Sequence, residues 1–190
     1  MPRTYSLADL GALAQRLASA GVIAYPTEAV FGLGCDPFSD AAVERLYKIK
    51  RRDPAQGFLL IAANEQQLQP FVDWSRLTPL QCAAVRATWP GPATWVLPRA
   101  PGSPSAVTGI HDGIAVRITA HAPAAALCRA FGGALVSTSA NLHGAPPARS
   151  AAEVERQFPG AELDGILDAP LGGLDQPTQI RDALTGRTIR

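Results

Sequence analysis

Five small residues in the second half of the chain, Ser137-Thr138-Ser139-Ala140-Asn141, carry three hydroxyls and one amide and no bulky side chain. They follow the apolar stretch Ala134-Leu135-Val136, so the pattern predicts a strand that ends in this run. Hydroxyls and backbone N–H groups at a strand end can approach the polar atoms of a ligand closely. The same residue types are ordinary in hydrogen-bonded turns, so the run alone fits a turn as well as a binding site.

Four cations crowd the end of a predicted helix: Lys48, Lys50, Arg51 and Arg52, with Asp53 as the nearest counter-charge. Cations are favourable at a helix C-terminus through the macrodipole alone. Four in five residues exceed what a helix end needs and would suit a triphosphate or pyrophosphate, which arginine grips bidentately and lysine attracts as a point charge. A solvated basic surface is the alternative interpretation.

The familiar phosphate-binding fingerprints are missing from this sequence, since it has neither a P-loop nor a G-x-G-x-x-G motif. Gly32-Leu33-Gly34 matches only the first three positions of the G-x-G-x-x-G motif and is predicted to form a turn. Any nucleotide site must therefore be of another design.

Arg117 lies inside the apolar stretch Ile114-Ala115-Val116-Arg117-Ile118. Strand alternation puts Val116 and Ile118 on one face and Arg117 on the other. A buried arginine needs an anionic partner, either a carboxylate of the protein or one of a ligand. Arg149 and Arg181 are similar candidates, with a surface ion pair as the simpler explanation for each.

The string Trp89-Pro90-Gly91-Pro92-Ala93-Thr94 combines two prolines and a glycine that restrict the backbone, and Thr94 opens a predicted strand. It fits either a rigid corner with Trp89 in the core or the wall of a ligand pocket.

Nothing in the sequence indicates a metal site or a covalent nucleophile. The histidines, His111, His121 and His143, lack ligand spacing to one another or to the cysteines. No G-x-S-x-G elbow is present, and Ser137 and Ser139 have no evident activating base. These features favour a site that binds and orients substrates over one that forms an enzyme-bound covalent intermediate.

The bulk composition indicates one globular domain spanning residues 1–190, since 47% of residues are apolar and 17% are charged. The net charge of +1 leaves any basic surface local. Cys35, Cys82 and Cys128 are widely spaced and odd in number, which is typical of reduced thiols. We see no export signal and no membrane-spanning stretch, and we expect a cytoplasmic protein without membrane contact.

Several elements can be placed from caps and periodicity. Ser6 with Asp9, Thr78 with Gln81, and Ser150 with Glu153 have capping-box spacing. Helices are predicted at 6–20, from Ser39 to about 50, from 78 onward, at 122–131 and at 150–157. Strands are predicted at 22–25, 58–62, 93–97, 114–118, 134–137 and 164–168. Because these elements mix without strict alternation, we expect an α/β fold with a twisted mixed parallel and antiparallel sheet flanked by helices.

Taken together, these strings resemble the YrdC family of threonylcarbamoyl-AMP synthases, in its short bacterial form. The matching segments span nearly the whole chain in the family's order: 25–34 (Tyr-Pro-Thr-Glu-Ala-Val-Phe-Gly-Leu-Gly), Lys50-x-Arg52, 60–64, 89–94, 115–117, 135–141 and 180–186. One departure is Asp53, where the family usually has proline, and Pro54 follows one residue later.

The resemblance implies an enzyme that joins L-threonine, bicarbonate and ATP into L-threonylcarbamoyladenylate and releases pyrophosphate. The product serves to modify the adenosine next to the anticodon of tRNAs that read ANN codons. By resemblance, Lys50 and Arg52 are the catalytic residues and hold the ATP phosphates together with Mg²⁺. The residues expected around threonine and carbamate are Thr27, Thr94, Arg117 and Ser137. Those expected on the AMP side are Ser139, Asn141, Arg149 and Arg181.

Two other functions compete with this one. An RNA-binding or assembly module could use a concave basic face around Lys50 and Arg52, but the near-neutral charge and the lack of aromatic stacking motifs weigh against it. A carbamoyl-transfer domain of hydrogenase maturation is disfavoured because no fused domains are present. The resemblance leaves direct contact with tRNA or double-stranded RNA open, and it implies separate proteins for the downstream threonylcarbamoyl transfer.

Overall fold

Most of the expected helices and strands form where their caps and apolar runs predicted them. The computed structural model describes residues 2–142, 144–160, 162–176 and 178–189. The strands are β1 (Thr4–Tyr5), β2 (Ile23–Pro26), β3 (Phe31–Gly34), β4 (Leu59–Ala62), β5 (Ala93–Pro98), β6 (Gly113–Ile118), β7 (Leu135–Ser139), β8 (Gly165–Leu167) and β9 (Gln179–Asp182). The α-helices are α1 (Leu10–Ala18), α2 (Asp40–Lys50), α3 (Pro79–Arg86), α4 (Ser105–Thr108), α5 (Ala122–Phe131) and α6 (Ala151–Gln157), and 3₁₀ turns span Leu7–Asp9, Pro54–Gln56, Glu65–Leu68 and Trp74–Arg76.

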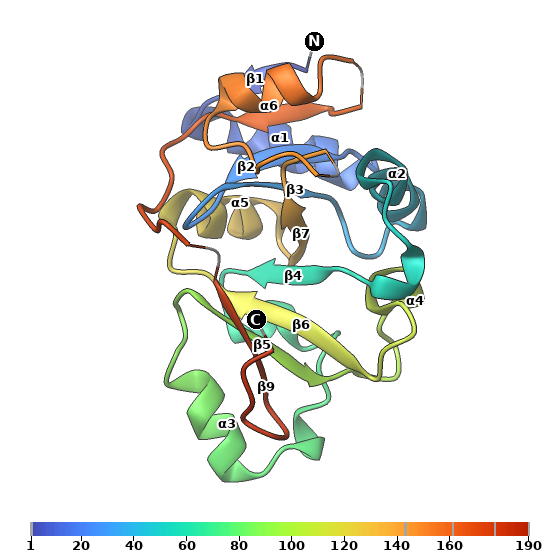
Figure 1. The fold of residues 1–190 in the computed structure, drawn as a ribbon, viewed down its shortest axis with the longest axis vertical. Helices are drawn as coiled ribbons and strands as arrows, with labels where there is room; N and C mark the ends of the chain where they lie inside the picture. Colours follow the sequence, from blue (N-terminus) through green and yellow to red (C-terminus); the bar gives the residue numbers. More distant parts are fainter. Residues whose placement is uncertain (1, 143, 161, 177, 190) are drawn as a thin grey trace.

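Within the described residues the strands form one mixed sheet in the order β1-β8-β2-β3-β7-β4-β6-β5-β9. The first half of β7 pairs with β4, with Leu59 opposite Ser137, and its second half pairs with β3, with Gly32 opposite Ser139. Strand β7 therefore joins the two halves of the sheet, which lie above and below it in Figure 1. The expected α/β fold with a mixed sheet and flanking helices is confirmed, and the hydroxyl-rich run lies at its junction.

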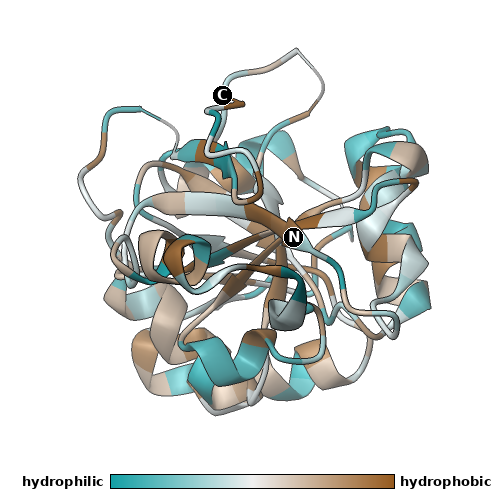
Figure 2. Cartoon of the chain, turned by 90° about the horizontal axis from the view of Figure 1, so that it is seen from below, coloured by the Kyte–Doolittle hydropathy of each residue, from teal (hydrophilic) through white to brown (hydrophobic). Residues whose placement is uncertain are grey.

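Apolar side chains cover both faces of this sheet. Helices α1 and α5 pack together on one face, over a cluster that includes Leu13, Tyr25 and Leu127. A larger cluster, which includes Leu46 of α2 and Val154 of α6, fills the other face. Figure 2 shows hydrophobic residues concentrated on the central strands and hydrophilic ones on the outer sides of the helices. No helix in the ranges given above is long and apolar enough to cross a membrane.

The prediction that Gly32-Leu33-Gly34 forms a turn is wrong, because these residues belong to the buried strand β3. Partners on both sides hold the segment extended: Gly34 pairs with Ile23 of β2, and Leu33 pairs with Thr138 of β7. The glycines permit close packing. A Cβ on Gly34 would lie 2.4 Å from the carbonyl oxygen of Val136. Two further strands, β1 and β9, were not predicted from the sequence.

Gly34→Ala is expected to lower the free energy of unfolding by about 2 kcal/mol or more, since the new methyl group would collide with backbone on β7 and with the ring of Tyr25. Gly11→Ala is the matched control. Its Cβ would meet nothing within 4 Å and it sits in helix α1, so it should raise stability by about 0.5–1 kcal/mol. Urea denaturation of both variants measures the difference. Equal stability of the two variants would contradict the packing described here.

Candidate active site

A cavity of about 670 Å³ opens where the two halves of the sheet meet. Its walls include residues of the β2–β3 turn, β3, the segment before β4, β6 and the end of β7, together with residues of α4, β5 and β9. The site residues expected from sequence that line it are Thr27, Arg52, Arg117, Ser137 and Ser139. The structure thus gathers these five residues from four separate segments around one cavity.

The hydroxyl-rich run forms the wall that β7 contributes. Ser137 is buried, and its Oγ lies 3.3 Å from the position a Cβ on Gly32 would take, so the glycine keeps this wall open. Ser139 donates a hydrogen bond from its Oγ to Asn141 Oδ1 at 2.6 Å. Asn141 in turn donates from Nδ2 to the carbonyl of Ala145 at 2.8 Å. These contacts fix the Ser139 hydroxyl in place.

Lys50, the last residue of α2, is bonded to this wall. Its Nζ donates to the carbonyl oxygens of Ser139 (2.7 Å) and Asn141 (2.5 Å) and to Asn141 Oδ1 (2.8 Å). Burial, and to a lesser degree the charge of Arg52, lowers the pKa of Lys50 to about 8. Lys50 is not among the residues that line the cavity. It ties the end of β7 to the end of α2.

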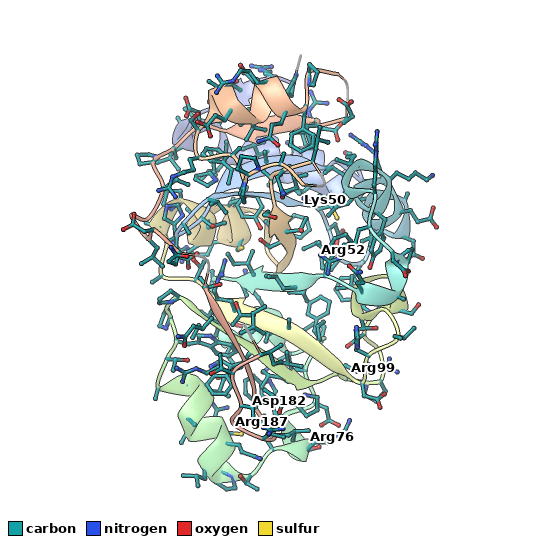
Figure 3. The ribbon with its side chains drawn as sticks, in the orientation of Figure 1. Lys50, Arg52, Arg76, Arg99, Asp182 and Arg187 are labelled. Carbon is teal, nitrogen blue, oxygen red and sulfur yellow. The ribbon has the colours of Figure 1, made fainter. Side chains whose placement is uncertain are left out.

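Arg52 reaches the cavity directly, since a tight turn after α2 redirects the chain. Arg51 has a left-handed backbone (φ 47°), and Arg52 places its guanidinium 5.2 Å from the ring centre of Phe58. Asp53 accepts a hydrogen bond from the backbone of Ala55 (2.9 Å) and so caps the next 3₁₀ turn. In Figure 3, Lys50 and Arg52 lie beside the central strands, far from Arg76 and Arg187 at the other end of the molecule.

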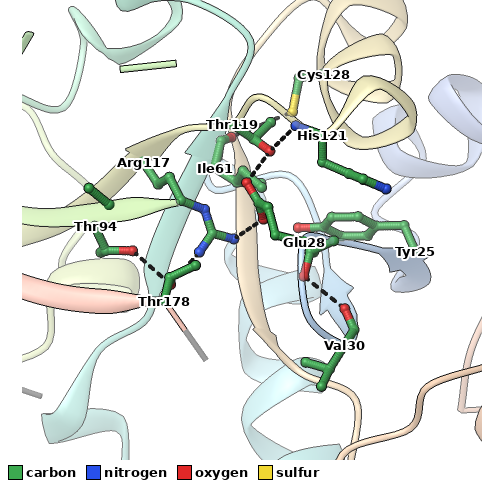
Figure 4. Close-up of polar contacts among 12 residues, drawn as sticks. Tyr25, Glu28, Val30, Ile61, Thr94, Arg117, Thr119, His121, Cys128 and Thr178 are labelled. Carbon is green, nitrogen blue, oxygen red and sulfur yellow. Dashed lines mark hydrogen bonds and ion pairs between the residues drawn. The ribbon is translucent and has the colours of Figure 1, made fainter. Parts of the chain in front are cut away.

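Arg117 has the anionic partner that its place on a covered strand required. Its Nη2 lies 3.2 Å from Glu28 Oε2, and both side chains are about nine-tenths buried. Its Nη1 donates to Thr178 Oγ1 at 2.6 Å (Figure 4). Thr119 donates to the other carboxylate oxygen, Glu28 Oε1, at 2.6 Å. The partner is therefore a carboxylate of the protein itself.

Two threonines expected at the site are held by neighbouring groups. Thr27 donates from Oγ1 to the carbonyl of Val30 (2.7 Å), which closes the turn between β2 and β3. Thr94 is fully buried, and its Oγ1 lies 3.4 Å from Thr178 Oγ1, in the same polar group as Arg117. Thr94 stands behind the cavity wall and is not one of its lining residues.

Three more of the expected residues, Asn141, Arg149 and Arg181, do not line the cavity. Arg149 is exposed, and its backbone N–H donates to Glu153 Oε2 (2.7 Å) at the start of α6. Arg181 pairs in register with Trp95, and its guanidinium lies 5.8 Å from the Trp95 ring centre. Its strand neighbour Ile180 lines the cavity, so alternation puts Arg181 on the opposite face of the sheet.

Sequence reasoning missed Glu28, Thr119 and Thr178 as parts of this site. Glu28 offered a signal, because it is a charged residue directly after a buried strand in the string Tyr25-Pro26-Thr27-Glu28. Thr178 offered none, since its role depends on a contact with a distant strand.

Comparison with known proteins supplies the family. A model described as "Telomere recombination", for the family of Sua5, YciO and YrdC, matches residues 15–190. This chain belongs to the Sua5/YciO/YrdC family. A relative named threonylcarbamoyl-AMP synthase, from Xanthomonas campestris pv. campestris strain B100, is 54% identical over 190 residues, which is 100% of both chains.

Solved structures agree with this family membership. Sua5 of P. abyssi, determined in complex with L-threonine, matches with a TM-score of 0.86 and 26% identity, over 96% of this chain and 54% of that one. This chain therefore spans about half the length of that protein. YciO of E. coli matches with a TM-score of 0.82 and 22% identity, over 96% of this chain and 90% of its own, and shows the shared fold.

Proposed function

We propose that this protein is an L-threonylcarbamoyladenylate synthase. The observation that carries the proposal is the 54% identity, over the full length of both chains, to the threonylcarbamoyl-AMP synthase of X. campestris. The L-threonine held by P. abyssi Sua5, a protein with the same fold, supports an amino acid as one substrate. The cavity fits such a reaction because its walls combine the cations Arg52 and Arg117 with the hydroxyls of Ser137 and Ser139.

The reaction joins L-threonine, bicarbonate and ATP and yields threonylcarbamoyl-AMP, pyrophosphate and water. The threonine amine and bicarbonate form a carbamate with loss of water. A carbamate oxygen then attacks the α-phosphorus of ATP and forms a P–O bond to it. The bond between the α-phosphorus and the oxygen that bridges to the β-phosphate breaks, and pyrophosphate leaves with its electrons. This is nucleotidyl transfer without an enzyme-bound intermediate. It asks the protein to align three ligands and to stabilise charge at phosphorus.

We assign threonine and carbamate to the end of the cavity near Arg117. The guanidinium supplies the positive charge that a carboxylate or carbamate needs, and arginine offers several donors in a fixed plane. Ser137 lines the cavity beside it, and Thr27 forms the turn that faces it. Thr94 supports this end from behind through Thr178.

We assign the nucleotide to the end near Arg52 and Ser139. Arg52 lines the cavity as a cation for phosphate oxygens. Lys50 would act next to it, on the condition that it releases one of its three hydrogen bonds to Ser139 and Asn141 when phosphate binds. Contact of Arg149 or Arg181 with AMP remains a proposal from resemblance alone, and it requires these side chains to move from the positions described above.

Mg²⁺ enters this proposal as part of the ATP substrate. Among the described residues, no three His, Cys, Asp or Glu side chains lie together as a metal-binding group. The phosphates would therefore supply the ligands of the ion, and bound Mg²⁺ would neutralise charge on the leaving pyrophosphate. Arg52 and Lys50 would complete that neutralisation.

We further propose that the product passes to separate proteins that transfer the threonylcarbamoyl group to tRNA in the cytoplasm. The free thiols of Cys35, Cys82 and Cys128 suit a reducing compartment. A purely RNA-binding role has less support, because a cavity with hydroxyls on its wall is not needed to bind a phosphate backbone.

The test is pyrophosphate release by the purified protein with ATP, Mg²⁺, bicarbonate and L-threonine, and with each omitted in turn. We expect release only when all the substrates are present. Release without threonine, or no release with the full set, would overturn the assignment. Double-stranded RNA binding in the absence of any release would favour the rival function.

A further inference from the structure

Glu28 is the most deeply buried carboxylate near the cavity, and the reaction proposed above gives it no task. Only about 7% of its side chain is exposed. Its position on the turn between β2 and β3 puts it next to Thr27, which lines the cavity. A buried carboxylate is costly to desolvate, so we expect this one to have a role that offsets the cost.

The position of this carboxylate is fixed without the help of Arg117. The backbone of Glu28 is covered by the segment 170–174, where Leu174 N donates to the Glu28 carbonyl (3.0 Å) and Gly172 N donates to the Thr27 carbonyl (3.0 Å). A Cβ on Gly172 would lie 2.8 Å from Glu28 Cα, so this segment rests directly on the turn. At the other end of the side chain, Thr119 Oγ1 donates to Glu28 Oε1 at 2.6 Å.

Thr119 is itself held in place. Its Oγ1 also accepts a hydrogen bond from the backbone of His121 (3.0 Å), and the His121 ring nitrogen Nε2 lies 3.0 Å from the carbonyl oxygen of Pro170, at the start of the covering segment. Figure 4 shows Thr119 and His121 on the far side of Glu28 from Arg117. The carboxylate is thus anchored at one oxygen and presents the other to the guanidinium.

Arg117 meets this fixed carboxylate through one nitrogen and keeps donors for a ligand. Nη2 lies 3.2 Å from Glu28 Oε2, and Nη1 donates to Thr178. The buried Nε finds no hydrogen-bond partner in the part of the chain that the structure describes. A guanidinium has five N–H donors, so this arrangement leaves several for the cavity that Arg117 lines.

We propose that Glu28 is a positioning residue that aims Arg117 at the carboxylate or carbamate of the amino-acid substrate. The inference rests on the proposed function for the identity of that substrate. Without the charge of Glu28, the long arginine side chain can adopt other rotamers, and its guanidinium is no longer fixed for a bidentate contact. The effect should fall on the amino acid and not on ATP, because the proposed function assigns the nucleotide to Arg52 and Ser139, which also line the cavity.

The test compares Glu28→Gln with Glu65→Gln. Glu65 forms a bidentate ion pair with Arg86 on the surface (2.6 and 2.8 Å), so its variant also removes an Arg partner but away from the cavity. For Glu28→Gln we expect the KM for L-threonine to rise by about tenfold or more, because the loss of one charged interaction corresponds to a factor of this size. The KM for ATP should change by less than about twofold. Glu65→Gln should change neither.

A second variant keeps the inference testable if Glu28→Gln folds poorly. Thr119→Val has nearly the same shape, leaves both charges in place and removes the hydrogen bond that fixes Glu28 Oε1. It should raise the KM for L-threonine by about threefold to tenfold, a smaller effect than that of Glu28→Gln, because one hydrogen bond to the carboxylate is lost while the ion pair with Arg117 stays.

Equilibrium binding of L-threonine to each variant separates this inference from the function it rests on. If the wild-type protein neither binds threonine nor releases pyrophosphate, the function is wrong. If the wild-type protein does both and the two cavity variants match it, the positioning role of Glu28 is wrong. Equal rises in the KM values for ATP and for threonine would point to general damage and would also overturn it.

Discussion

Arg117→Met is expected to abolish threonine-dependent pyrophosphate release and to lower the free energy of unfolding by about 3–5 kcal/mol. The substitution removes the cation at the threonine end of the cavity and leaves Glu28 buried without its ion-pair partner. An uncompensated buried charge accounts for most of the stability loss, since methionine fills much of the volume. Activity assays and urea denaturation measure the two effects.

The double variant Glu28→Gln with Arg117→Met separates the loss of activity from the loss of stability. Removal of both charges should restore most of the lost stability, because neither group is then charged and unpaired. Activity should stay absent, since the cation at the cavity is still missing. Recovery of activity in the double variant would show that Arg117 has no role in substrate binding.

Lys50→Met is expected to reduce kcat/KM for ATP by about a hundredfold or more, a factor that corresponds to roughly 3 kcal/mol of charged hydrogen bonds. The three acceptors that Lys50 holds, on Ser139 and Asn141, lose their donor, so the end of β7 loses its anchor to α2. Lys48→Met is the matched control on the same helix, because Lys48 is exposed. It should leave the kinetics within about twofold of the wild type.

The pH dependence of ATP affinity gives a second measurement on the same residue. Burial lowers the pKa of Lys50 to about 8, so the ammonium loses its proton as the pH rises through that value. Binding of a polyphosphate favours the charged form, and the affinity for ATP should therefore fall above about pH 8 in the wild type. Lys50→Met should lack this fall. If both proteins show the same pH profile, Lys50 is not the group that titrates.

The helix starts could be predicted because capping is local. Ser6 with Asp9 and Thr78 with Gln81 form reciprocal capping boxes, as their spacing indicates. At α6 the Ser150 hydroxyl accepts from Glu153 N, but the Glu153 carboxylate accepts from Arg149 N and not from Ser150. Even there the helix begins where the pattern placed it.

The features that the sequence did not predict depend on contacts between residues that are far apart in the chain. Gly32 and Gly34 are turn residues by composition, yet β2 and β7 hold them extended on both sides. Arg181 shares this limit, because it lies in β9 and the register of that strand with β5 places it beside Trp95. The need of Arg117 for an anion was predictable, whereas the choice of Glu28 was not, because only the folded chain brings the β2–β3 turn beside β6.

Formation of threonylcarbamoyl-AMP from isotopically labelled bicarbonate, followed by mass spectrometry, tests the central claim most directly. The protein with ATP, Mg²⁺ and L-threonine should yield an adenylate that contains threonine and the labelled carbon, together with one pyrophosphate for each adenylate formed. The account predicts that the product is free in solution and that no labelled group stays covalently attached to the protein. An adenylate without the labelled carbon, or a label bound to Ser137 or Ser139, would contradict it.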